Sequence, residues 1–140
     1  MECKVKWLGS EGMSFIASTG TGHIIAMDGA AEAGGNNLAP RPMELLLAGT
    51  AGCSSFDVVL ILKKARQHIM GCDVKITAER AETDPKVFTD IKLHFVVSGK
   101  SLDKHKVEQA IKLSHDKYCS AAAMLSKTAE MTYSFEIIES

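Results

Sequence analysis

The sequence predicts an α+β protein of one domain, with its elements in the order βββ-α-ββ-αα-β. A length of 140 residues and a hydrophobic share of 46% are sufficient for one core. One long apolar stretch without proline has the character of a buried helix, and short segments on both sides of it alternate apolar and polar residues with the period of β-strands. Because strands and helices come in separate runs, the class is α+β, with no internal repeat.

The N-terminal part predicts a three-stranded meander. Cys3–Trp7 alternates apolar with charged residues, as a strand with one buried face does. Residues 13–17 and 23–27 are two more strand candidates, separated by a glycine-rich turn at 20–22. Residues 29–40, rich in Gly, Ala and Asn, are expected to form a loop.

One long helix is expected from Met43 to about Ile69. Pro42 suits a first helical turn, and no further proline follows in the stretch. The first two-thirds are apolar nearly all round, so other elements must cover every side. Gly49 and Gly52 leave room for another helix to approach, which favours a homodimer packed on this segment. The alternative is that these glycines are simply tolerated, at about 1 kcal/mol each relative to alanine.

The C-terminal half predicts two antiparallel strands, two helices and a closing strand. The periodicity changes from two residues to helical spacing and back again. The expected elements are strands at 72–78 and 91–98, helices at 102–117 and 119–125, and a strand at 132–138.

The net charge of the chain and its first residues indicate which partners and which cellular location to expect. The formal net charge is −1 and the lysines are scattered, so a nucleic-acid partner is not expected. The first six residues alternate in charge where a secretory leader would be apolar, so the expected location is the cytoplasm. The apolar stretch at 45–62 contains Asp57 and small polar residues, which argues against a membrane span.

The four cysteines are far apart and form no CxxC pair, so neither a zinc knuckle nor a thioredoxin motif is present. Cys3 and Cys72 lie on apolar strand faces and are interpreted as core residues. Cys53 and Cys119 lie among small residues that leave room for a ligand. Spacing alone leaves open whether they form a functional pair or belong to the core.

Metal and cofactor sites are not expected. Of the five histidines, His115 alone could share a helix face with a cysteine, Cys119, and two ligands are too few for a metal site. No GxSxG, P-loop or dinucleotide fingerprint is present.

The segment PMELLLAGTAGC, residues 42–53, resembles the central-helix signature of the OsmC/Ohr family, the osmotically inducible and organic hydroperoxide resistance proteins. Cys119 follows Cys53 by 66 residues, as a second family cysteine would, and the strand order agrees. The resemblance covers essentially the full length and is strongest to the YhfA-like branch.

The resemblance implies an intertwined homodimer, in which antiparallel sheets of both chains wrap two long central helices. It also implies a peroxide reductase acting on organic hydroperoxide or hydrogen peroxide. Cys53 would be the peroxidatic thiolate, and Cys119 would resolve its sulfenic acid to a disulfide. A dithiol, such as a lipoylated protein, would then reduce that disulfide.

Three further residues are candidates for supporting roles. Family members that reduce hydroperoxides use an arginine of the N-terminal sheet and a glutamate ten residues before the first cysteine, where this chain has Met43. Glu44 lies about 180° around the helix from Cys53, and Arg41 about 18 Å along the axis from it, so Arg41 would act from the partner chain or through a bend. Asp57 follows Cys53 by one turn and places negative charge on the same face.

The departures from the family pattern keep a second function open. The alternative is a non-enzymatic dimer that binds a small ligand in a cysteine-lined pocket or senses the thiol redox state.

Overall fold

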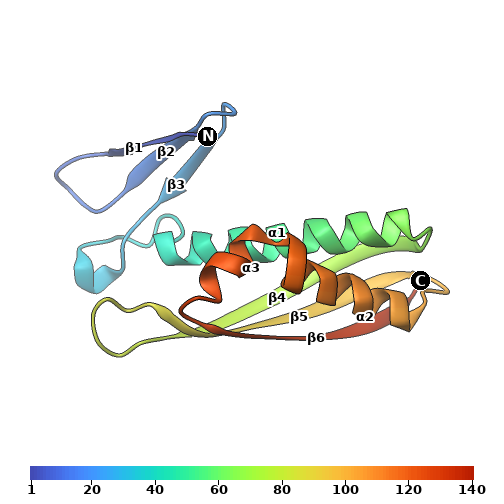
Figure 1. Cartoon of the computed structure of the whole chain (residues 1–140). Helices are drawn as coiled ribbons and strands as arrows, with labels where there is room; N and C mark the ends of the chain where they lie inside the picture. The colour runs from blue at the N-terminus through green and yellow to red at the C-terminus, as the bar shows by residue number, and fades with distance from the viewer. The chain divides into compact units, whose positions relative to one another are not determined.

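The computed structural model describes residues 1–140 and confirms the predicted α+β class and order of elements (Figure 1). The chain divides into two units, Met1–Leu46 and Leu47–Ser140, which are described separately below.

The first unit contains the predicted meander. Its strands are β1 (Cys3–Trp7), β2 (Phe15–Thr19) and β3 (Ile24–Met27), and the order in the sheet is β1-β2-β3 with antiparallel pairing throughout. A short 3-10 turn, η1 (Ala31–Ala33), follows in the loop.

The prediction that Cys3 is a core residue is wrong for the single chain. Cys3 is exposed, and its neighbours Val5 and Trp7 on the same strand face are 55% and 50% exposed. Within residues 1–46 only Ala17 and Asp28 are buried. The alternation of β1 correctly indicates a strand, but no layer within residues 1–46 covers its apolar face.

Asp28 organises the loop that follows β3. Its side chain is 1% exposed and accepts hydrogen bonds from the backbone N–H groups of Gly29 at 2.7 Å, Leu38 at 3.1 Å and Asn36 at 3.2 Å. The Leu38 N–H holds the pKa of Asp28 below its usual value, with help from the other two N–H groups and against the effect of burial. One carboxylate thus ties together three points of a glycine-rich segment.

We expect Asp28→Asn to destabilise the protein at pH 7, because an amide NH₂ cannot accept the bonds that the second carboxylate oxygen accepts. The folded-state pKa lies below the unfolded value, so this stabilisation is present above about pH 4 and is lost as the pH falls through the folded-state value. Urea denaturation at a series of pH values measures it: the gap between the midpoints of wild type and variant should close in acid. Glu32→Gln, at an exposed position of the same loop, is the matched control. Equal midpoints for Asp28→Asn and wild type at pH 7 would contradict the assignment.

The second unit is built on a three-stranded sheet with the helices lying over it (Figure 1). The strands are β4 (His68–Arg80), β5 (Phe88–Lys100) and β6 (Glu130–Glu139), in the order β4-β5-β6. The helices are α1 (Pro42–Lys64), whose first turn falls in the first unit, α2 (Lys104–Leu113) and α3 (Ser120–Leu125). A π-helical turn, η2 (Ser114–Tyr118), joins α2 to the segment before α3.

The core of this unit combines one face of β5 with one face each of α1 and α2. Its central members are less than 2% exposed and are Val58, Leu62, Ile91, Phe95, Val97, Val107, Ala110 and Ile111. Along β5 the buried residues from Ile91 to Gly99 recur at every second position, as the period-2 pattern predicts.

The expectation of purely antiparallel sheets is wrong for the last strand. β4 and β5 pair antiparallel, whereas β5 and β6 run parallel, with Leu93 opposite Tyr133. Between β5 and β6 the chain passes through α2, η2 and α3, which is the long crossover that a parallel pair needs. Residue alternation marks a strand but carries no information on its direction.

The helix α1 ends earlier than the expected residue, about Ile69. Arg66 adopts a left-handed backbone conformation, with φ of 57°, and its N–H bonds the carbonyl of Lys63 at 3.0 Å. The Gln67 N–H bonds the carbonyl of Leu62 at 2.9 Å, which closes the last turn, and β4 begins at His68. A C-terminal cap of this kind usually carries glycine, so an arginine there gave no signal in the sequence.

Only one face of α1 is buried within the chain. Thr50, Ser54, Val58 and Leu62 are buried at every fourth position. A different face is exposed along its length and consists of Gly49, Gly52, Phe56 and Leu60. We call these four residues the open face of α1. By length and composition α1 is also apolar enough to cross a membrane, a property that core helices of water-soluble proteins share.

Candidate functional site

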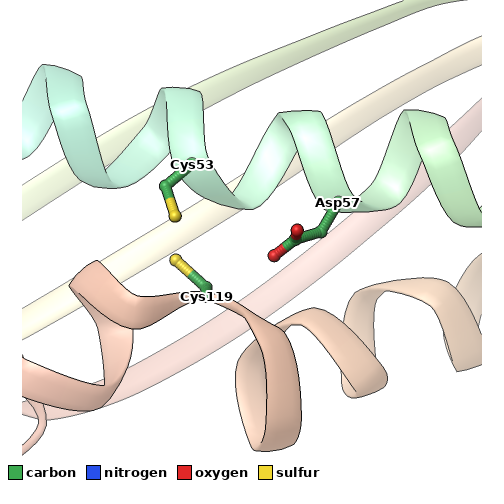
Figure 2. Close-up of side chains that lie close together, drawn as sticks. All are labelled: Cys53, Asp57 and Cys119. Atoms are coloured by element: carbon green, nitrogen blue, oxygen red, sulfur yellow. The ribbon is translucent and has the colours of Figure 1, made fainter.

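Cys53, Asp57 and Cys119 form a cluster between α1 and the segment that precedes α3 (Figure 2). The two sulfur atoms point toward one another, and the carboxylate of Asp57 lies beside them. The two Sγ atoms and a carboxylate oxygen lie within 4.8 Å of one another. The structure therefore brings together the two cysteines that the sequence singled out, from positions 66 residues apart.

Local backbone geometry places Cys119 at this point. The Cys119 N–H donates to the Ser114 carbonyl at 2.8 Å, closing the π-helical turn, and the chain then becomes extended at Cys119 before α3 begins. Turns of this kind are frequent at functional sites. Cys119 is the N-cap of α3: its sulfur accepts a hydrogen bond from the Ala122 N–H at 3.4 Å. Cys119 is 2% exposed, so its thiol is enclosed by the protein.

The buried Ser114, which is itself bonded to the buried Ser54, holds the carboxylate of Asp57. The Ser114 hydroxyl donates to Asp57 Oδ2 at 2.9 Å, and the Ser54 and Ser114 hydroxyl oxygens are 3.2 Å apart. Because the Ser114 hydroxyl donates its hydrogen to the carboxylate, its oxygen accepts the hydrogen bond from the Ser54 hydroxyl. The chain of bonds from Ser54 through Ser114 to Asp57 joins α1 to η2 at the site.

Sequence reasoning missed both serines. The available signal was a polar residue at each position of an otherwise buried helix face. A buried hydroxyl needs a hydrogen-bond partner, and here Ser54 bonds Ser114, which in turn bonds Asp57.

The surroundings of Cys119 disfavour its thiolate. Burial raises the pKa of Cys119 to about 11; the Ala122 N–H acts in the opposite direction, and the Cys53 thiol and the Asp57 charge raise the value further. At pH 7 about one molecule in ten thousand then carries the Cys119 thiolate. Resolution by Cys119 is therefore expected to depend strongly on pH.

We expect native Cys119 to react with iodoacetamide about tenfold faster for each pH unit between 7 and 10, because only the thiolate attacks. Mass spectrometry of the Cys119 peptide, with chelator present, measures the rate. In urea the midpoint should fall to about 8.5, the value of a free cysteine. A native midpoint below pH 9 would contradict the proposed environment.

The other two supporting candidates belong to the first unit. The Arg41 backbone N–H donates to Glu44 Oε1 at 3.0 Å, so the Glu44 carboxylate satisfies a free N–H at the start of α1. Both residues are exposed. Asp57 is the one supporting candidate that lies in the cluster.

Comparison with known proteins agrees with this architecture. Residues 34–134 match the family model described as OsmC-like protein. Protein YhfA of Escherichia coli (strain K12) is 45% identical over 138 residues, which covers 99% of this chain and 98% of that protein.

Solved structures show the same fold. A hypothetical protein from Aquifex aeolicus VF5 is 32% identical with a TM-score of 0.85, over 99% of this chain and 96% of that chain. An organic hydroperoxide resistance protein from Elizabethkingia anophelis is 16% identical with a TM-score of 0.74, over 99% and 97% of the two chains, and shows the fold alone. The family match and the YhfA identity together confirm the resemblance found in the central helix. The chain belongs to the OsmC-like protein family.

Proposed function

We propose that this protein is a cysteine-dependent peroxide reductase, acting on organic hydroperoxides or hydrogen peroxide. The observation that carries the proposal is that the thiols of Cys53 and Cys119 face one another within the same small cluster (Figure 2). A sulfenic acid formed on one sulfur would have the other thiol directly beside it.

In the proposed cycle, the Cys53 thiolate attacks one oxygen of the peroxide. The O–O bond breaks, an alcohol or water leaves after taking up a proton, and Cys53 becomes a sulfenic acid. Cys119 then attacks that sulfur, water is lost and the disulfide forms. An external dithiol, such as a lipoylated protein, returns both residues to thiols. Exposure supports this division of roles, because Cys53 is only half-buried, whereas Cys119 is buried.

The working assembly in this proposal is a homodimer packed through the open face of α1. Phe56 in that face is 68% exposed and Leu60 is 39% exposed, both on a long and largely apolar helix. A Cβ added at Gly49 or Gly52 would meet no atom of this chain within 4 Å, so nothing in the chain occupies the space beside them. A second α1 would cover this face, as the family resemblance implies.

The direct test mixes fully reduced protein with cumene hydroperoxide and follows the Cys53–Cys119 disulfide by mass spectrometry. We expect rapid and stoichiometric formation, absent in Cys53→Ser and retained in Cys72→Ser, whose half-buried thiol is outside the cluster. Survival of both thiols in a large peroxide excess would reject the reductase.

A non-enzymatic redox sensor is the second candidate, and the position of Asp57 favours it. Burial and, to a smaller extent, the negative charge of Asp57 raise the pKa of Cys119, which makes the resolving thiolate scarce at neutral pH. A sensor would form the disulfide once and slowly, without catalytic turnover when a dithiol is supplied in excess. The same mass-spectrometric series with added dithiol distinguishes the two.

A further inference from the structure

We propose that Cys53, Asp57 and Cys119 form a binding site for a thiophilic divalent cation, with Zn²⁺ as the ion that fits best, in the reduced protein. Two sulfur atoms and one carboxylate oxygen converge within 4.8 Å of one another, from α1 and from the segment before α3. The site is a property of the cluster itself and stands independently of the proposed reductase.

The spacing of the three donor atoms is close to that of a bound ion. Zinc binds sulfur at about 2.3 Å and carboxylate oxygen at about 2.0–2.2 Å, so donors around one tetrahedral zinc lie about 3.5 Å apart. The donor atoms would need to approach one another by at most about 1.3 Å from the observed limit of 4.8 Å. Rotation of the half-buried Cys53 and Asp57 side chains can provide it, while the buried Cys119 stays in place.

The donor set selects the class of ion. Thiolate ligands prefer zinc and softer metals, whereas Mg²⁺ and Ca²⁺ require sites built from oxygen alone. Two cysteines and one carboxylate give three protein ligands, which leaves a fourth tetrahedral position for water or another small ligand. A divalent ion would displace the protons of the two thiols to solvent, and its charge would offset that of the two thiolates so formed.

The residues around the cluster already hold two of the three ligands. Ser114, fully buried, donates to Asp57 Oδ2 at 2.9 Å and leaves the other carboxylate oxygen available. The Ala122 N–H donates to Cys119 Sγ at 3.4 Å and would stabilise its negative charge when bound to metal. Outer hydrogen bonds of this kind orient metal ligands and increase affinity.

The site would be controlled by the redox state of the two cysteines. A Cys53–Cys119 disulfide would remove both sulfur ligands, so oxidation would release the ion. Conversely, a bound ion would occupy both sulfurs and protect them from peroxide. Metal occupancy and peroxide reactivity are thus expected to exclude one another.

The test titrates Cd²⁺, and separately Zn²⁺, into reduced and chelator-treated full-length protein carrying Cys3→Ser and Cys72→Ser. These two changes remove the thiols outside the cluster. The ultraviolet absorption of cadmium thiolate and isothermal titration calorimetry report binding without reference to activity. We expect one ion per chain, at least tenfold weaker binding in Asp57→Asn, and loss of the thiolate absorption in Cys53→Ser. Glu108→Gln, which changes an exposed carboxylate of α2 outside the cluster, is the matched control and should bind as its parent does.

Two outcomes would overturn the proposal. One is unchanged affinity in both Asp57→Asn and Cys53→Ser, which would place the ion elsewhere. The other is equal binding by the protein in which a mild oxidant has formed the Cys53–Cys119 disulfide. That comparison needs no substitution in the cluster, so it remains decisive even if a cluster variant fails to fold.

Discussion

Cys53→Ser is expected to abolish catalytic peroxide consumption, lowering the rate by about 10³-fold or more. A serine hydroxyl is almost never ionised at neutral pH and cannot form a sulfenic acid, so neither step of the proposed cycle remains. The measurement is the disappearance of cumene hydroperoxide in the presence of excess dihydrolipoamide, with the enzyme at limiting concentration.

Two further variants separate the roles of the cysteines. Cys119→Ser should consume one equivalent of peroxide per chain and leave a sulfenic acid on Cys53 that dimedone traps. Cys72→Ser should turn over like wild type, because Cys72 lies outside the cluster. Turnover by Cys53→Ser at the wild-type rate would remove Cys53 from the mechanism.

Phe56→Asp is expected to convert the proposed dimer to monomers. Burial of one phenylalanine side chain contributes about 1.5–3 kcal/mol, and a symmetric interface loses two of them. The dissociation constant should therefore rise by about 10³-fold, before the cost of burying the new carboxylate is added. Sedimentation velocity over a range of micromolar concentrations measures the change.

The control for this variant is Tyr118→Asp, which places the same charge at another exposed aromatic residue, in η2 and outside the open face of α1. It should sediment as wild type does. A Phe56→Asp protein that remains dimeric at all concentrations would show that the open face of α1 is not the interface.

Local patterns in the sequence predicted the fold because the spacing of apolar residues differs between a strand and a helix. Alternation in Cys3–Trp7 and along β5 identified strands, and the apolar stretch after Pro42 identified α1. The family resemblance of residues 42–53 came from the same stretch and is confirmed by the match over residues 34–134. These features depend on neighbours along the chain.

Other features of the fold depend on contacts that local patterns do not encode. The parallel pairing of β6 with β5 follows from the path of the crossover through α2 and α3. The end of α1 depends on a single left-handed residue, Arg66, of a type that seldom marks such a position. The exposure of Cys3 depends on what covers β1, which its alternation cannot reveal.

For the site, the sequence by itself determined which residues carry the chemistry: two cysteines among small neighbours, and a carboxylate one turn after the first of them. Only the tertiary structure decided that these three converge, that Ser114 holds Asp57 across 57 residues of sequence, and that Cys119 is buried against an N–H of α3. The physical reason is range. The signals that marked these residues, small neighbours and helical spacing, involve residues within one or two helical turns. The distance between the two sulfurs is instead determined by the packing of α1 against the segment that joins η2 to α3.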